Sequence, residues 1–142
     1  MDGQESDELL DEVAAIYAGH TDPERLVDAF RRAVLLCPTE DREPLAVDDR
    51  GITWLLAFTT PAALARWAVA RGDGAVTWEF ARIDGALLLD VAAPEVGSPC
   101  GVAVDVGSDR PLLLPPVRGI VPDRAAVDEK NGAVSARRSV GL

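Results

Sequence analysis

A strand-like segment that runs directly into a helix start restricts the fold of this chain more than any other feature. Residues 52–59 are rich in β-branched and aromatic side chains, as is typical of a β-strand. Thr60 then offers an N-cap oxygen and Pro61 suits a first helical turn, which predicts a helix over residues 62–71. Its apolar face consists of Leu64, Trp67 and Ala68. A strand coupled to a helix in this way indicates a mixed α and β protein.

Two helices are predicted before this junction. Residues 7–18 combine an acidic side with an apolar stripe at helical spacing: Leu9, Leu10, Val13, Ile16 and Tyr17. The second helix follows Thr21 or Asp22 as N-cap, with Pro23 in its first turn and a capping box formed by Thr21 and Glu24. It presents an apolar face made of Leu26, Val27, Phe30 and Val34.

The remaining pattern predicts short strands and one ambiguous segment. Strands are expected at residues 34–38, ending at Pro38, at 45–47 and at 76–81. Residues 101–106 and 111–116 flank a four-residue turn and predict a hairpin. Residues 84–93 fit a helix capped by Asp84 better than a buried strand, although periodicity cannot decide between them.

These elements define a single α+β domain. The 142 residues are enough for one hydrophobic core, and the order of elements lacks strict β–α–β alternation. We therefore expect about four helices with a mixed or antiparallel sheet of about four or five strands. The expected organisation is an acidic amphipathic helix at residues 1–19, an α+β domain at 20–117 and a poorly structured tail at 118–142.

Acidic residues are concentrated at the N-terminus. The chain has 24 acidic and 14 basic residues, a net charge of −10, which argues against nucleic-acid binding. Residues 1–28 contain nine acids and one base. This face is either a solvated helix surface or a contact for a basic partner protein. The candidate contact residues are Asp7, Glu8, Asp11 and Glu12.

Other sequence features indicate the cellular compartment of the protein. The N-terminus is acidic where a signal peptide is cationic, and no apolar run approaches the ~20 residues needed to cross a bilayer. Cys37 and Cys100 are too few for a disulfide framework, so two buried thiols in a cytoplasmic protein are expected. Arginine outnumbers lysine 13 to 1, as is typical of high-GC bacterial genomes.

The sequence contains no recognisable catalytic, cofactor-binding or metal-binding motif. The single histidine, His20, is expected in a turn, and Cys37 lies among apolar neighbours that disfavour a reactive thiolate. Four carboxylates in pairs are assigned to turns in preference to catalysis: Asp48, Asp49, Asp105 and Asp109. Three tryptophans are assigned to the core, with an interface anchor as the alternative for one of them: Trp54, Trp67 and Trp78.

The middle of the chain resembles the N-terminal domain of the enhanced-serine-sensitivity (SseB) family. The likeness covers roughly residues 20–116 and includes residues 26–30, the strand at 34–38 and Phe58-Thr59-Thr60-Pro61 leading into the helix that carries Leu64 and Trp67. Asp105-Val106-Gly107 departs from the Asn-Pro-Gly-like turn expected there. The resemblance implies an α+β fold and supplies no catalytic residues.

Three functional hypotheses follow. The first is a non-enzymatic bacterial interaction domain, accessory to a secretion or stress system. The second is an immunity-type protein that neutralises a basic toxin or nuclease through its acidic face. The third is a small-ligand-binding protein or enzyme that uses Asp48, Asp49, Asp105 or Asp109. The sequence leaves open whether the chain forms a homodimer, since an amphipathic first helix can pair with its copy; no nucleic acid, membrane or cofactor is expected.

Overall fold

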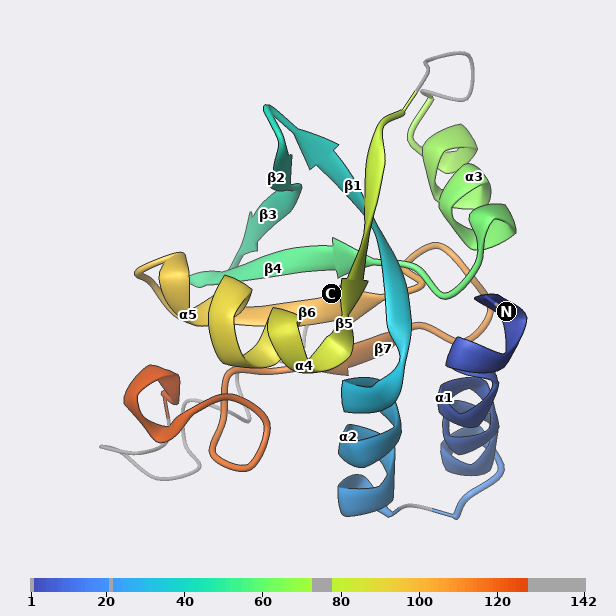
Figure 1. Ribbon diagram of the computed structural model, residues 1–142, viewed down its shortest axis with the longest axis horizontal. Helices are drawn as coiled ribbons and strands as arrows, with labels where there is room; N and C mark the ends of the chain where they lie inside the picture. Colours follow the sequence, from blue (N-terminus) through green and yellow to red (C-terminus); the bar gives the residue numbers. More distant parts are fainter. Residues whose placement is uncertain (1, 21, 73–77, 128–142) are drawn as a thin grey trace.

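The fold consists of helices and short strands in an α+β arrangement (Figure 1). The computed structural model describes residues 2–20, 22–72 and 78–127. The helices are α1 (Asp2–Tyr17), α2 (Pro23–Arg32), α3 (Pro61–Ala70), α4 (Gly85–Leu87), α5 (Ala93–Glu95) and the 3-10 turn η2 (Asp123–Ala125). A π-helical segment, Leu88–Ala92, joins α4 to α5, so the three form one continuous helix, here called the 85–95 helix. The strands are β1 (Val34–Glu40), β2 (Glu43–Pro44), β3 (Ala46–Asp49), β4 (Ile52–Ala57), β5 (Phe80–Asp84), β6 (Cys100–Val104) and β7 (Leu112–Leu114).

The strands form two sheets. One has the order β2-β1-β5 and is antiparallel, and the other has the order β3-β4-β6-β7, in which β4 and β6 run parallel. The sheets meet where Leu36 and Phe58 exchange backbone hydrogen bonds of 2.8 Å in both directions. The predicted α+β class is confirmed, and the strands are divided between two sheets because β1 leaves β4 after this single bridge.

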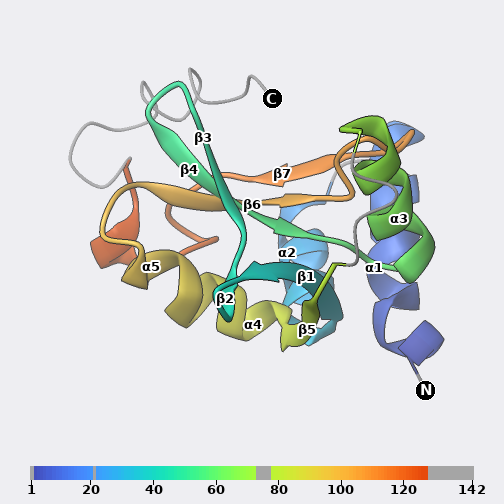
Figure 2. The ribbon, with the colours of Figure 1, turned by 90° about the horizontal axis from the view of Figure 1, so that it is seen from above.

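Two apolar clusters form the core. The larger cluster joins α1, α2 and the 85–95 helix to the sheets and includes Leu9, Phe30 and Leu89, each 0 % exposed. The smaller cluster lies against α3 and contains Trp54, Phe58 and Trp67. Figure 2 shows the 85–95 helix along one side of the four-stranded sheet, with α1 and α3 at one end of it. These two clusters fix the helices to the sheets.

The starts of α2 and α3 agree with the sequence, whereas α1 begins at Asp2 and not at residue 7 as predicted. The Asp22 carboxylate accepts a bond from the Arg25 N–H at 3.3 Å, and the Thr60 hydroxyl oxygen accepts one from the Ala63 N–H at 3.1 Å. The predicted role of Thr21 lies outside the described residues. The predicted apolar stripe of the first helix is only partly buried, because Leu10 is 37 % and Tyr17 50 % exposed. That stripe is wider than the surface that α2 and β1 cover.

Among the strands, the largest difference between predicted and observed boundaries is that of β5. The alternating pattern predicted a strand at residues 76–81, but the strand is Phe80–Asp84; Trp78 and Glu79 lie in no strand, and residues 76–77 lie outside the described residues. Pairing with β1, from Val34↔Asp84 to Pro38↔Phe80, determines where the strand begins and ends. The alternation of apolar and polar residues at positions 76–81 gives no information about pairing with the distant strand β1.

Two further boundaries differ. β1 continues past Pro38 to Glu40, because proline lacks only the N–H, and its carbonyl accepts a bond from the Leu45 N–H at 2.8 Å. The helical preference for residues 84–93 is confirmed, since a helix runs from Gly85 to Glu95. However, Asp84 makes no side-chain capping bond, so the cap predicted for it is wrong.

The C-terminal part of the described chain is folded. Residues 117–127, here called the C-terminal strap, include η2 and place Val121 in the core at 4 % exposure. The segment expected to be a loose tail therefore begins with a folded stretch, and residues 128–142 lie outside the described residues.

Candidate functional site

The four predicted contact residues of α1 divide into two pairs. Glu8 forms two bonds with the Arg32 guanidinium, from Nε to Oε1 at 3.0 Å and from Nη2 to Oε2 at 2.5 Å. Glu12 pairs with Arg25 of α2 at 3.3 Å. Both carboxylates therefore attach α1 to α2, and the bond from Arg32 keeps the pKa of Glu8 below its ordinary value.

The other two carboxylates face solvent and lie about 100° around α1 from Glu8 and Glu12. Asp7 and Asp11 are exposed, and the exposed Leu10 and Tyr17 lie along the same side at helical spacing. We call these four residues the outer stripe. The Tyr17 hydroxyl donates a 2.6 Å bond to the Pro111 carbonyl, which holds the end of α1 against the loop between β6 and β7. Two charges and two apolar side chains thus share one surface.

A third ion pair attaches α2 to the 85–95 helix. Arg31 donates to both oxygens of Asp90, at 2.9 and 2.5 Å. This bidentate bond is the main reason that the pKa of Asp90 lies below its ordinary value, with smaller contributions from the charges of Arg31 and Arg124. It holds the π-helical segment, which carries Asp90, in place beside α2.

The thiols do not have the environment of a nucleophile. Cys37 and Cys100 are buried and not disulfide-bonded, as the sequence predicted. Burial raises the pKa of Cys37 to about 12 and that of Cys100 to about 11. His20, expected in a turn, is exposed just after α1 beside a cleft of about 500 Å³ shared with Glu12, Asp22 and Arg25.

We expect neither thiol to react with iodoacetamide in the folded protein at neutral pH. The raised pKa values reduce the thiolate fraction by roughly a thousandfold for Cys37 and roughly a hundredfold for Cys100 relative to a free cysteine, and burial blocks access as well. Intact-mass measurement should show no added label in buffer and two labels in urea. One label on the folded chain would show that a cysteine is accessible and activated.

Asp105 has a role that the sequence analysis missed. It lies after β6 with a positive φ of 53°, as a turn residue can, but its side chain is only 8 % exposed. Its carboxylate accepts bonds from the Thr59 N–H at 2.8 Å and the Thr59 hydroxyl at 2.7 Å. Burial raises the pKa of Asp105, and the Thr59 bonds oppose this shift. The departure at Asp105-Val106-Gly107 was the only sequence signal of this position.

The other three candidate acids and the tryptophans occupy different environments. The turn assignment of Asp48 and Asp49 is wrong, because pairing with β4 places both in β3, next to the turn at residues 50–51. Asp48 accepts a 2.6 Å bond from the Thr53 hydroxyl, and Asp109 is exposed. Trp54 and Trp67 are buried, which confirms their assignment to the core. Trp78 is half-buried; its ring lies 5.1 Å from that of Trp67. The Arg71 guanidinium stacks on both Trp67 and Trp78.

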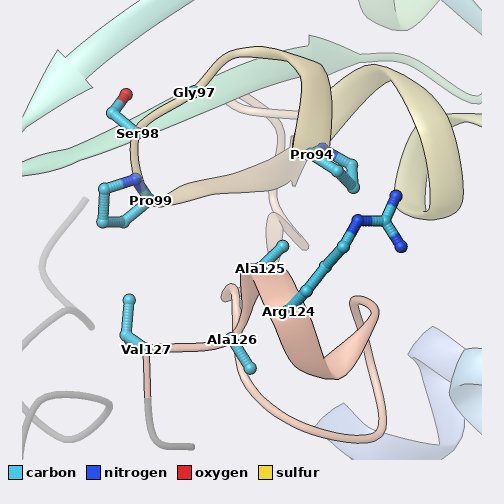
Figure 3. Close-up of a pocket in the computed structure, with 8 residues that line it drawn as sticks. All are labelled: Pro94, Gly97, Ser98, Pro99, Arg124, Ala125, Ala126 and Val127. Carbon is cyan, nitrogen blue, oxygen red and sulfur yellow. The ribbon is translucent and has the colours of Figure 1, made fainter. Parts of the chain in front are cut away.

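Two further clefts border the C-terminal strap. One, of about 490 Å³, separates residues 117–120 of the strap from Pro23, Glu24, Val27 and Asp28 of α2. The other, of about 460 Å³, lies between residues 124–127 and the end of the 85–95 helix with the loop after it. In Figure 3, Pro99 and Val127 border this second cleft on one side, with Pro94 and Arg124 on the other. Asp48, Asp49, Asp105 and Asp109 line none of these three clefts.

The part of the chain that the structure describes holds neither a metal-binding cluster nor a helix suited to span a membrane. Among residues 2–20, 22–72 and 78–127, no group of three or more histidine, cysteine or acidic side chains is arranged to hold a metal ion. Over the same ranges, no helix combines the length and the apolar character that a membrane span requires.

Comparison with known proteins identifies the family. Neither the curated proteins nor the solved structures include a match to this chain. The family described as SseB protein N-terminal domain matches residues 7–118, which is most of the chain and includes α1, both sheets and the Asp105 turn. The chain therefore belongs to the SseB family through its N-terminal domain.

Proposed function

We propose that this SseB domain is a non-catalytic, cytoplasmic interaction module of bacterial origin that binds a partner protein with a basic surface through α1. The observation that carries the proposal is the outer stripe, where Asp7 and Asp11 lie exposed beside Leu10 and Tyr17. Carboxylates attract and orient a basic partner, whereas exposed aromatic and aliphatic side chains supply apolar contact area.

The ion pairs of α1 support this choice of surface. Of the four candidate acids, Glu12 and Glu8 are paired with Arg25 and Arg32, whereas Asp7 and Asp11 lie exposed on the outer stripe. Because α1 is also held by buried Leu9 and Val13 and by the Tyr17 bond to Pro111, its outer side is presented on a rigid support. A rigid surface loses little conformational entropy on binding.

Charge reversal tests the proposal. With the wild-type chain immobilised in lysate of the native host, we expect a stoichiometric partner that the variant Asp7→Lys/Asp11→Lys no longer retains. The matched control is Glu79→Lys/Glu95→Lys, which makes the same change in net charge at exposed positions elsewhere and should retain the partner. Elution by moderate salt is expected, since exposed charges are screened.

Association and dissociation rates then distinguish electrostatic steering of the partner from an indirect effect of the substitutions. For the purified partner, the double reversal at positions 7 and 11 should slow association by roughly tenfold or more at low salt, with a smaller effect at high salt. Tyr17→Ala should instead speed dissociation, since it removes an aromatic contact. Equal retention of the partner by wild type and the Asp7/Asp11 variant would contradict the proposal, as would the absence of any stoichiometric partner.

A further inference from the structure

The C-terminal strap lies mainly outside the family domain on which it rests. The family match ends at residue 118, and the strap continues to residue 127 across the side formed by α2 and the 85–95 helix. Figure 1 shows η2 at the far side of the molecule from α1. Any role of the strap is therefore separate from the proposed binding through the outer stripe.

The backbone of the strap is closed on itself. The Val127 N–H donates a 2.8 Å bond to the Pro116 carbonyl, which brings the two ends of the segment together. Bonds within it run from Ile120 and Val121 to the Val117 carbonyl, each at 3.1 Å, and from Ala125 to Pro122 at 2.8 Å. A compact surface loop with adjoining ends is an Ω-loop.

One side chain anchors the strap. Val121 is the buried residue of the strap, at 4 % exposure, whereas Ile120, Ala125 and Ala126 pack at the edge of the core and remain partly exposed. On either side of this anchor a cleft separates the strap from the body, about 490 Å³ toward α2 and about 460 Å³ toward the 85–95 helix. The strap is therefore packed against the rest of the domain at Val121 and is separated from it by a cleft on each side of this residue.

Charge adds a weak attachment beside the second cleft. Arg124 attracts Asp90, whose carboxylate is already bonded in bidentate fashion by Arg31. The Arg31 bond remains within the family domain when the strap leaves, so separation gives up the weaker attraction between Arg124 and Asp90 and keeps the bidentate pair. Segments with few buried contacts open at lower free energy than the core around them.

From these contacts we infer that the C-terminal strap is a lid. It opens as a unit, hinged next to Pro115 and Pro116, while the SseB domain beneath it stays folded. Opening withdraws Val121 from the core and exposes the part of the larger apolar cluster on which it packs. The closed form seen here is one of two states.

Hydrogen exchange of the full-length chain tests this inference. Under native conditions we expect amides of residues 119–127 to exchange at least a hundredfold faster than those of β4 and β6, because opening of the strap does not require global unfolding. Val121→Ala should accelerate exchange in the strap by roughly a further tenfold and leave β4 and β6 unchanged. The matched control is Val102→Ala in β6, at 0 % exposure, which should accelerate exchange of the core strands.

Two outcomes would overturn the lid. One is exchange of the strap at the same rate as β6 in the wild type, which would make it part of a single cooperative unit. The other is acceleration of β4 and β6 by Val121→Ala to the same degree as the strap. Neither measurement involves α1 or a partner protein. A result that disproves the lid therefore leaves the proposed function unaffected, and a result that disproves the proposed function leaves the lid unaffected.

Discussion

Gly85→Ala is expected to destabilise the protein by roughly 3 kcal/mol or more, enough to unfold much of a marginally stable domain. A Cβ at this position would lie 1.8 Å from the Phe30 carbonyl oxygen and 2.7 Å from the Phe30 carbonyl carbon. Both atoms belong to the backbone of α2, which cannot rotate away as a side chain can. The Gly85 N–H also donates to the Ala33 carbonyl at 2.9 Å, so the start of the 85–95 helix is joined closely to the end of α2.

Urea titration followed by circular dichroism measures this effect. The matched control is Ala86→Gly at the neighbouring helical position, where the expected cost is about 1 kcal/mol or less from helix propensity. A stability of Gly85→Ala within about 1 kcal/mol of the wild type would show that α2 and the 85–95 helix do not approach this closely.

Asp105→Ala is the second substitution with a large expected effect, about 3 kcal/mol. It removes both bonds to Thr59, and a buried donor that loses its partner costs about 1–3 kcal/mol. Alanine also tolerates the positive φ of 53° less well than aspartate or asparagine, at a cost of about 1–2 kcal/mol. Asp105→Asn should restore most of the loss, because an amide oxygen can accept from the Thr59 N–H, and asparagine is favoured at such a φ.

The pH dependence separates the charge of Asp105 from its hydrogen bonds. Since burial raises the folded-state pKa, the native state holds this proton more tightly than the unfolded state does. The resulting stabilisation is fully present below the unfolded-state pKa of about 4 and is lost as the pH rises through the folded-state value. Asp105→Asn lacks this loss, so its stability relative to wild type should increase with pH across that window and level off above it.

Urea midpoints of the wild type and Asp105→Asn, measured from acidic to neutral pH, provide the comparison. A relative stability of the asparagine variant that falls with increasing pH would mean that the Thr59 bonds outweigh burial, and that the pKa of Asp105 is lowered.

Only part of the candidate site on α1 could be predicted from the sequence. The pattern of α1 placed all four acids on its polar side, but it could not separate Asp7 and Asp11 from Glu8 and Glu12. That division depends on Arg32 and Arg25 of α2, which lie beside α1 only after the helices pack. The buried, hydrogen-bonded position of Asp105 could not be predicted from the sequence either, because its partner Thr59 is 46 residues away.

Local sequence by itself determined where α2 and α3 begin and which segments are apolar. Asp22 and Thr60 cap their helices through bonds to residues three positions ahead, and such short-range contacts are encoded in adjacent residues. Tertiary structure alone decided the extent of β5, the division into two sheets, and the packing of the strap around Val121. Each of these depends on partners distant in sequence, whose pairing and burial energies override weak local preferences.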